Sequence, residues 1–252
     1  MSIQGYPKFT SLRTFLWKKL YTKAHKIFTM SNLTKNLIYE KLNYSNAIVT
    51  NNPIITRELS TLSKEKLSEE EKEIFNKKVI ICVGRLTRQK KFLDVIHAIK
   101  NLEKEFINKI NLVILGEGEQ KELIINEIKK NNIKNVFLLG YKKNPYKYIS
   151  KSTLFISSSL WEDPGHALIE AAYLNKFIIT SECDAGPKEM FINKFNCLSY
   201  TPERVDILTR QIRVFFQDLS LNEKNRIKYN AKKLSQNFTE FQFYKSISKF
   251  IT

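Results

Sequence analysis

The stretch that decides the fold is KVIICVGRLTRQKK, residues 78–91. Its first part, residues 78–83, is a short apolar run rich in Ile and Val, which is typical of a strand buried on both faces. Gly84 ends the run, and a basic loop leads into apolar positions at helical spacing over residues 93–102. A buried strand, a glycine-containing turn and a helix in this order form the repeating unit of a parallel α/β sheet.

The same unit recurs as far as about residue 200. Further apolar strands are predicted at residues 111–115, 136–139, 154–157, 177–180 and 197–200. Helices are predicted between and after them, at residues 120–130, 166–174, 187–192, 205–218, 225–234 and 240–250. Continuous apolar strands that alternate with helices predict a doubly wound parallel sheet covered on both faces, and such sheets bind ligands at the carboxyl ends of their strands.

The chain before this region is basic and amphipathic. Apolar side chains recur at helical spacing near its start, at Leu12, Phe15, Leu16 and Leu20. Two structures fit the pattern: surface helices that pack on a core, or a helix that lies on a membrane surface.

Two further elements are predicted before residue 56. Ser31 is a predicted N-cap of a second helix, and residues 47–50 form a predicted short strand. Residues 56–76 are polar and charged, and we expect a connection there with one or two helical turns.

Charge and composition narrow the classes of function. The formal net charge of +17 raises nucleic acid or an anionic membrane as partners, because a strong positive field attracts both. Most of the excess is lysine, and no recognisable nucleic-acid module accompanies it, so no specific nucleic acid is expected. No apolar run approaches the roughly 18 residues of a membrane span, and we expect a soluble protein of the cytoplasm. Cys82, Cys183 and Cys197 have no metal-ligand spacing, and neither a metal nor another cofactor is predicted.

The loop at residues 84–91 is the first candidate site. Arg85 and Lys90 can converge on an anion, the guanidinium as a planar fork and the ammonium as a point charge, and a diphosphate fits that arrangement. A solvated basic loop without a ligand fits the same residues equally well. Gly116 and Gly118 follow the next strand and resemble a nucleotide-binding glycine pair, although two such glycines also make an ordinary turn.

A second constellation is WEDPGHALIE, residues 161–170, in which two glutamates stand eight positions apart. A helix is predicted to begin near Gly165, and its first N–H groups would face the edge of the sheet and offer a phosphate site. Glu170 would lie on the first turns of this helix, where it could accept hydrogen bonds from sugar hydroxyls, and Glu162 would lie in the loop opposite. Taken alone, both glutamates also fit ordinary surface carboxylates.

The order and spacing of these motifs resemble a known family. Gly-Arg-Leu-x3-Lys after one strand, Gly-x-Gly after the next, Leu-Gly-Tyr after a third, then Ser-Ser, Glu-x7-Glu and Gly-Pro-x-Glu are similar to the C-terminal domain of family-4 retaining glycosyltransferases. The resemblance covers about residues 20–250. It implies two Rossmann-like domains, the GT-B fold, and metal-independent transfer of a sugar from a nucleoside-diphosphate sugar to a hydroxyl acceptor with retention.

The resemblance also implies roles for individual residues. Arg85 and Lys90 would hold the donor diphosphate and stabilise the departing nucleotide, so that with Glu162, which contacts the sugar, they form the catalytic set. Glu170 would bind the ribose, and Gly140, Tyr141 and Lys142 would lie near the base. The remaining donor-binding positions are Gly116, Gly165, His166, Ala167 and Leu168. The donor would be linked to UDP or GDP.

The chain departs from the family pattern at three places. Lys91 stands where a glycine is usual, and Asp163-Pro164 replaces Gly-Phe between Glu162 and Gly165. Most of the acceptor-binding domain is missing.

We therefore predict four segments. They are a remnant of the N-terminal domain at residues 1–55, a linker at 56–76, the nucleotide-sugar-binding domain at 77–235 and a C-terminal helix at 236–252 that crosses back.

These segments predict a truncated donor-binding half of an enzyme of polysaccharide, lipopolysaccharide or glycolipid synthesis, whose turnover without the missing domain is open. Its expected partners are a glycan or lipid-linked acceptor, a chain that supplies the missing domain, and the inner face of the cytoplasmic membrane. The alternative is a non-catalytic basic module that binds nucleic acid or an acidic membrane.

Overall fold

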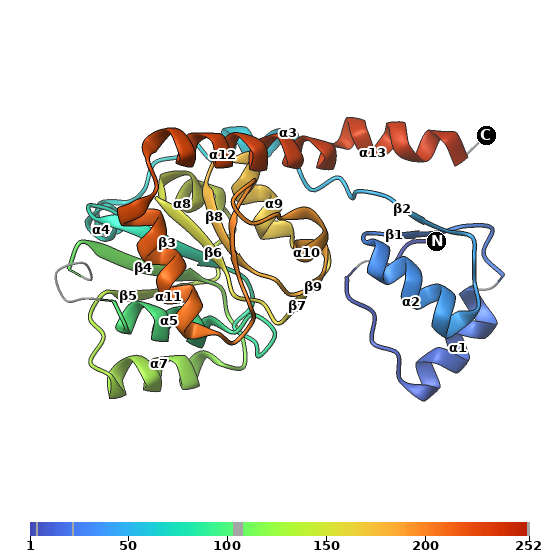
Figure 1. Cartoon of the computed structure of the whole chain (residues 1–252), viewed down its shortest axis with the longest axis horizontal. Helices are drawn as coiled ribbons and strands as arrows, with labels where there is room; N and C mark the ends of the chain where they lie inside the picture. Colours follow the sequence, from blue (N-terminus) through green and yellow to red (C-terminus); the bar gives the residue numbers. More distant parts are fainter. Residues whose placement is uncertain (4, 22, 103–107, 251–252) are drawn as a thin grey trace.

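The computed structural model describes residues 1–3, 5–21, 23–102 and 108–250 (Figure 1). Its main feature is a six-stranded sheet in which every pairing is parallel, in the order β10-β8-β6-β3-β4-β5. The strands are β3 (Lys78–Val83), β4 (Ile110–Leu115), β5 (Val136–Gly140), β6 (Leu154–Ser157), β8 (Phe177–Ser181) and β10 (Leu198–Tyr200). The predicted α/β class and doubly wound parallel sheet are confirmed, with strand ends that differ by at most one residue.

Side chains along each strand point alternately to the two faces of the sheet, which explains why helices cover both faces. In β3, Ile80 and Cys82 point into one apolar cluster, while Val79 and Ile81 point into the other. The first cluster lies under α5 (Phe92–Lys100), α7 (Lys121–Lys130) and α11 (Val205–Arg213). The second lies under α8 (Tyr146–Lys151), α9 (His166–Tyr173) and α12 (Leu221–Ser235). Figure 1 shows the two helical layers on opposite sides of the sheet.

Three short elements of the sheet domain escaped prediction. α8 spans six residues, which are too few to show a helical period that would distinguish the segment from a loop. β7 (Trp161–Glu162) and β9 (Asp184–Ala185) are two residues each and pair in parallel beside the main sheet. Their pairing joins segments that the sequence separates by more than 20 residues, so no local pattern indicates it. The predicted helix near residue 187 is present as α10 (Gly186–Met190).

A small N-terminal lobe is built as a strand–helix–strand unit. β1 (Ile27–Thr29) pairs in parallel with β2 (Ala47–Val49), and α2 (Asn32–Leu42) connects them. Ser31 is the N-cap of α2, as predicted, and its side chain accepts the N–H of Thr34 at 3.2 Å. The lobe has its own apolar cluster, which includes Ile27 and Ile38.

The first helix of this lobe, α1 (Ser11–Tyr21), corrects a prediction. Of the two alternatives from sequence, a surface helix that packs on a core is present, but the apolar side chains on which the prediction rested do not make the contact. Their exposed fractions are 69% for Leu12, 56% for Phe15, 43% for Leu16 and 61% for Leu20. The helix instead packs through Trp17 and Tyr21.

The segment between the lobes forms two short helices. α3 (Arg57–Leu62) buries Leu59 completely, and α4 (Glu69–Ile74) begins with a capping box of Ser68 and Glu71. Glu71 also accepts a hydrogen bond from Tyr148 of α8. These contacts fasten the segment onto the sheet domain.

The chain ends with helical segments that approach the N-terminal lobe. A π-helical turn (Val214–Asp218) follows α11, and a 3-10 turn (Gln236–Phe238), α13 (Glu240–Ile247) and a second 3-10 turn (Ser248–Phe250) follow α12. The N–H of Ile55 donates to the Phe238 carbonyl at 2.9 Å, and the ring of Phe250 lies 6.1 Å from that of Phe28 in β1. The last segment thus spans both lobes, as Figure 1 shows.

The three cysteines are free and buried, as the sequence predicts. Within the described residues no cluster of three His, Cys, Asp or Glu side chains could hold a metal ion. No helix in the described part of the chain is long and apolar enough to cross a membrane.

Candidate functional site

The loops that follow β3, β4 and β5 lie side by side and form the floor of the candidate site. The N–H of Gly84 donates to Leu115 O at 3.0 Å, and the N–H of Gly116 donates to Gly140 O at 2.9 Å. Gly116 has φ +146°, and a Cβ there would stand 1.9 Å from Gly84 O, so only glycine permits this approach. The glycine pair therefore has a structural role, which is to bring three loop backbones together at the carboxyl edge of the sheet.

Lys90 and Glu162 meet at this edge. Lys90 Nζ forms an ion pair with Glu162 Oε2, and Ser159 Oγ donates to the same carboxylate oxygen at 3.1 Å. The two charged side chains are only 19% and 14% exposed. Ser158 Oγ donates to Lys90 O at 2.7 Å and so holds the loop after β3 against the loop after β6. The structure thus joins two motifs that stand 72 residues apart.

Arg85, the second cation that was predicted to hold an anion, is exposed. Lys91, the departure from the family glycine, has φ 49° and ψ 39° at the N-cap position of α5. This left-handed conformation favours glycine, which accounts physically for the usual residue there. Lys91 Nζ forms a surface ion pair with Glu203 at 2.6 Å.

The predicted helix start at Gly165 is confirmed. Gly165 is the N-cap of α9 with φ 92°, and it supplies no side-chain cap to the helix. His166 follows at the exposed first position, with Ala167 next to it, partly buried. Leu168 is only 2% exposed, and its N–H donates to Gly165 O at 3.0 Å. The first two N–H groups of α9 are thus the ones that can face a ligand at this end.

Glu170 does not contact Glu162 but lies one turn further along α9, against α8. Tyr146 Oη donates to Glu170 Oε1 at 3.1 Å. Burial raises the pKa of Glu170, and the hydrogen bond from Tyr146 opposes this rise. Tyr146 was missed by the sequence reasoning, although Asn144-Pro145 before it was a usable signal for a helix start: Asn144 Oδ1 accepts the N–H of Tyr146 at 3.1 Å.

Tyr141, the predicted neighbour of the base, is 75% exposed in the loop after β5. Gly140 before it has φ 70°, so the chain turns in the left-handed region. Lys142 after it reaches the Glu71 carboxylate at 3.5 Å. The loop that presents Tyr141 is therefore tied to α4.

The N-terminal lobe contacts the same loop as Glu162. Asp163 is buried and accepts hydrogen bonds from Ser31 Oγ at 3.0 Å and Thr34 Oγ1 at 2.6 Å. Burial raises the pKa of Asp163, and the two hydroxyl hydrogen bonds oppose the rise. The Asp163 departure from the family pattern thus has a structural reason, because its carboxylate accepts hydrogen bonds from two hydroxyl groups at the start of α2.

Glu189 of α10 makes a second contact with α2. Its two carboxylate oxygens accept the N–H groups of Asn32 and Leu33, each at 2.8 Å. A carboxylate at a helix N-terminus is favoured by the helix dipole and satisfies N–H groups that have no partner within the helix. Glu189 and Asp163 therefore dock the lobe beside the candidate site.

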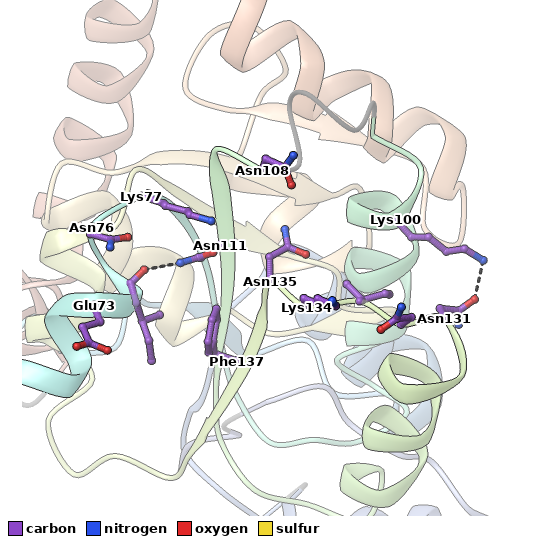
Figure 2. A pocket seen from close by; sticks show the side chains of 13 residues that line it. Glu73, Asn76, Lys77, Lys100, Asn108, Asn111, Asn131, Lys134, Asn135 and Phe137 are labelled. Carbon is purple, nitrogen blue, oxygen red and sulfur yellow. Dashed lines mark hydrogen bonds between the residues drawn. The ribbon is translucent and has the colours of Figure 1, made fainter.

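A pocket of about 890 Å³ lies elsewhere, at the end of the sheet where β3, β4 and β5 begin (Figure 2). Its wall is rich in asparagine and lysine, and several of these groups bond within the protein. Asn111 Nδ2 donates to Ile74 O at 2.7 Å, and Lys100 Nζ donates to Asn131 Oδ1 at 2.6 Å. Because parallel sheets of this type bind ligands at the opposite edge, we do not include the pocket in the candidate site.

Taken together, an anion-compatible loop, a paired lysine and glutamate and an open helix start lie at the carboxyl edge of a doubly wound sheet, and they make up the candidate site. The chain belongs to the family of glycosyl transferases group 1, whose family model matches residues 63–234. The suspected family relationship is confirmed.

Individual relatives agree with this assignment. An uncharacterized glycosyltransferase of Methanocaldococcus jannaschii is 33% identical over 237 residues, which is 88% of this chain and 57% of the relative. A Campylobacter jejuni N-acetylgalactosamine-N,N'-diacetylbacillosaminyl-diphospho-undecaprenol 4-alpha-N-acetylgalactosaminyltransferase is 30% identical over 158 residues, 62% of this chain and 42% of that protein. The chain therefore spans about half the length of the curated relatives it matches.

Solved structures share the fold. Anabaena Alr3699/HepE in complex with UDP superposes with a TM-score of 0.84 at 16% identity, over 98% of this chain and 70% of that one. TarM gives a TM-score of 0.76 at 17% identity, over all of this chain and 50% of that one. These likenesses confirm the GT-B type of architecture.

Proposed function

We propose that the chain binds a nucleoside-diphosphate sugar, linked to UDP or GDP, and supplies the donor half of a retaining glycosyltransferase. The observation that carries this proposal is the joining of Lys90, Glu162 and the start of α9 at the carboxyl edge of the sheet. Family membership and the UDP named for the Anabaena structure support it.

The diphosphate would lie between the basic loop and the start of α9. Arg85 and Lys90 would supply cations, and the N–H groups of His166 and Ala167 would supply neutral donors. As the bond between sugar and phosphate breaks, negative charge grows on the leaving diphosphate. A cation and N–H dipoles that are already in place lower the barrier without having to reorganise. No metal ion is needed for this role.

Two carboxylates would recognise the sugars. Glu162 lies beside Lys90 and would contact the transferred sugar, while Glu170, held by Tyr146, would accept hydrogen bonds from the ribose hydroxyls. Tyr141 is exposed at the end of β5 and would lie near the base. The side chains that hold Glu162 and Glu170 fix both carboxylates before a donor arrives, which lowers the ordering cost of binding.

The acceptor and the cellular setting belong to the same proposal. We propose a glycan or lipid-linked acceptor and a role in the synthesis of a cell-surface polysaccharide or glycolipid, at the cytoplasmic face of the membrane. The chain spans 57% of the first relative's length, so acceptor selection is assigned to a further domain or a partner chain that supplies it.

Calorimetry with UDP and GDP tests donor binding. We expect saturable binding of at least one nucleotide, a loss of about tenfold or more in Arg85→Ala and Lys90→Ala, and little change in Arg88→Ala, a matched exposed arginine of the same loop. Absence of binding by either nucleotide, together with an unchanged melting temperature, contradicts the proposal. Binding of nucleic acid or of an acidic membrane that survives Glu162→Ala and Glu170→Ala but weakens steeply with salt favours the alternative of a non-catalytic basic module.

A further inference from the structure

The outer face of α1 carries a continuous apolar stripe. At 100° per residue, Leu12, Leu16 and Leu20 follow one another along one side of the helix, and Phe15 lies beside them. These four side chains are between 43% and 69% exposed. The opposite side of the helix faces the lobe through Trp17, whose ring makes edge contacts with Phe9 at 5.3 Å and Tyr21 at 5.2 Å. The stripe therefore points away from the protein because the aromatic side is already anchored.

Cations border the stripe. Arg13 and Lys18 lie on either side of it, and Lys19 lies within it with its ammonium 4.7 Å from the centre of the Phe15 ring. The first acidic residue of the whole chain is Glu40, whereas seven lysines and arginines precede it. All charged side chains of residues 1–39 are thus positive, and the apolar stripe lies in this part of the sequence.

The position of α1 leaves the stripe accessible. Figure 1 shows the helix on the side of the N-terminal lobe that faces away from the six-stranded sheet. The candidate donor residues lie at the carboxyl edge of that sheet, so an object that covers α1 leaves them open.

We propose that the outer face of α1 docks on an anionic bilayer surface, with the Leu12, Phe15, Leu16 and Leu20 side chains in the acyl boundary and the flanking cations among the lipid phosphates. An apolar stripe bordered by basic side chains is the pattern of a helix that lies in the membrane interface. Each cation near the surface adds attraction to anionic lipid. A nucleic acid would use the cations but would leave the four apolar side chains in water. This proposal does not rest on donor binding.

Vesicle co-sedimentation tests the proposal with the full chain. We expect binding to vesicles of phosphatidylcholine and phosphatidylglycerol, weak binding to phosphatidylcholine alone, and a decrease with added salt. The triple variant Leu12→Ser, Phe15→Ser, Leu20→Ser should lose about tenfold or more of its partition coefficient. A matched double variant, Leu221→Ser with Phe241→Ser, alters exposed apolar side chains far from α1 and should bind as the wild type does.

A second variant distinguishes a loss of membrane binding from a loss of folding. Lys18→Glu with Lys19→Glu leaves the apolar stripe intact and should lower binding to the anionic vesicles while the circular dichroism melt stays unchanged. Equal binding to neutral and anionic vesicles, or full binding by the triple variant, overturns the proposal. A dimer of the wild type in sedimentation velocity that the triple variant abolishes also overturns the proposal. The proposal is overturned as well if the wild type does not bind vesicles but binds an oligonucleotide, and the triple variant binds that oligonucleotide with the same affinity. Calorimetry with UDP on the triple variant reports donor binding separately.

Discussion

The ionised carboxylate of Glu71 is expected to stabilise the sheet domain. It accepts hydrogen bonds from Tyr148 Oη and, at 3.0 Å, from the N–H of Ser68, and Lys147 Nζ lies 3.2 Å away. Burial by itself would raise the pKa of Glu71, but these hydrogen bonds and the charge of Lys147 outweigh burial and lower the pKa to about 2. Unfolding removes these partners and returns the pKa to its ordinary value of 4.5.

The difference between the two pKa values sets how much the ionised Glu71 carboxylate stabilises the folded state. At about 1.4 kcal/mol per pKa unit it corresponds to roughly 3 kcal/mol. The Glu71 side chain keeps 14% exposure, and screening by water lowers this figure to about 2 kcal/mol. Because the folded pKa is the lower one, the stabilisation is complete above about pH 4.5 and is lost as the pH falls toward about 2.

Glu71→Gln isolates the charge, because glutamine keeps the size of the side chain and can still close the capping box with Ser68. Urea denaturation at pH 7 should show a loss of about 2 kcal/mol in the free energy of unfolding. Glu73→Gln, at an exposed position of the same helix, should lose less than about 0.5 kcal/mol. Near pH 3 the difference between Glu71→Gln and the wild type should fall to less than about half. A loss that is the same at both pH values, or equal in the two variants, refutes the reasoning.

Three further predictions follow from single contacts. Lys91→Gly should be more stable to urea than Lys91→Ala by about 1 kcal/mol, because both variants lose the ion pair but only glycine suits the left-handed backbone; the opposite order contradicts this view. Glu189→Ala should weaken the docking of α2 by about 1 kcal/mol, which faster hydrogen exchange in α2 and faster proteolysis at residues 50–56 would report. Tyr146→Phe removes a hydrogen bond that lowers the pKa of Glu170, so the pH below which UDP or GDP affinity declines should move upward; an unchanged pH profile in calorimetry counts against a ribose-binding Glu170.

Much of the sheet domain could be predicted because its signals are local. The apolar run of β3, the turn at Gly84 and the amphipathic α5 each follow from residues within a few positions of one another. The helix start at Gly165 is equally local. By contrast, α8 is too short to show a period, and β7 with β9 exists only because two distant segments pair. Tyr146 therefore could not be placed against Glu170 from the sequence alone.

The sequence by itself predicted the order in which strands and helices alternate and indicated the candidate site residues, because hydrophobic period and turn residues act over short distances. Only the tertiary structure decided which of these residues meet. It joined Lys90 to Glu162, placed Asp163 against α2, and turned the apolar stripe of α1 outward. The reason is that helical spacing defines a face but not its direction: Trp17 and Tyr21 make up the face that packs on the lobe, and the stripe that contains Leu12 is left facing solvent.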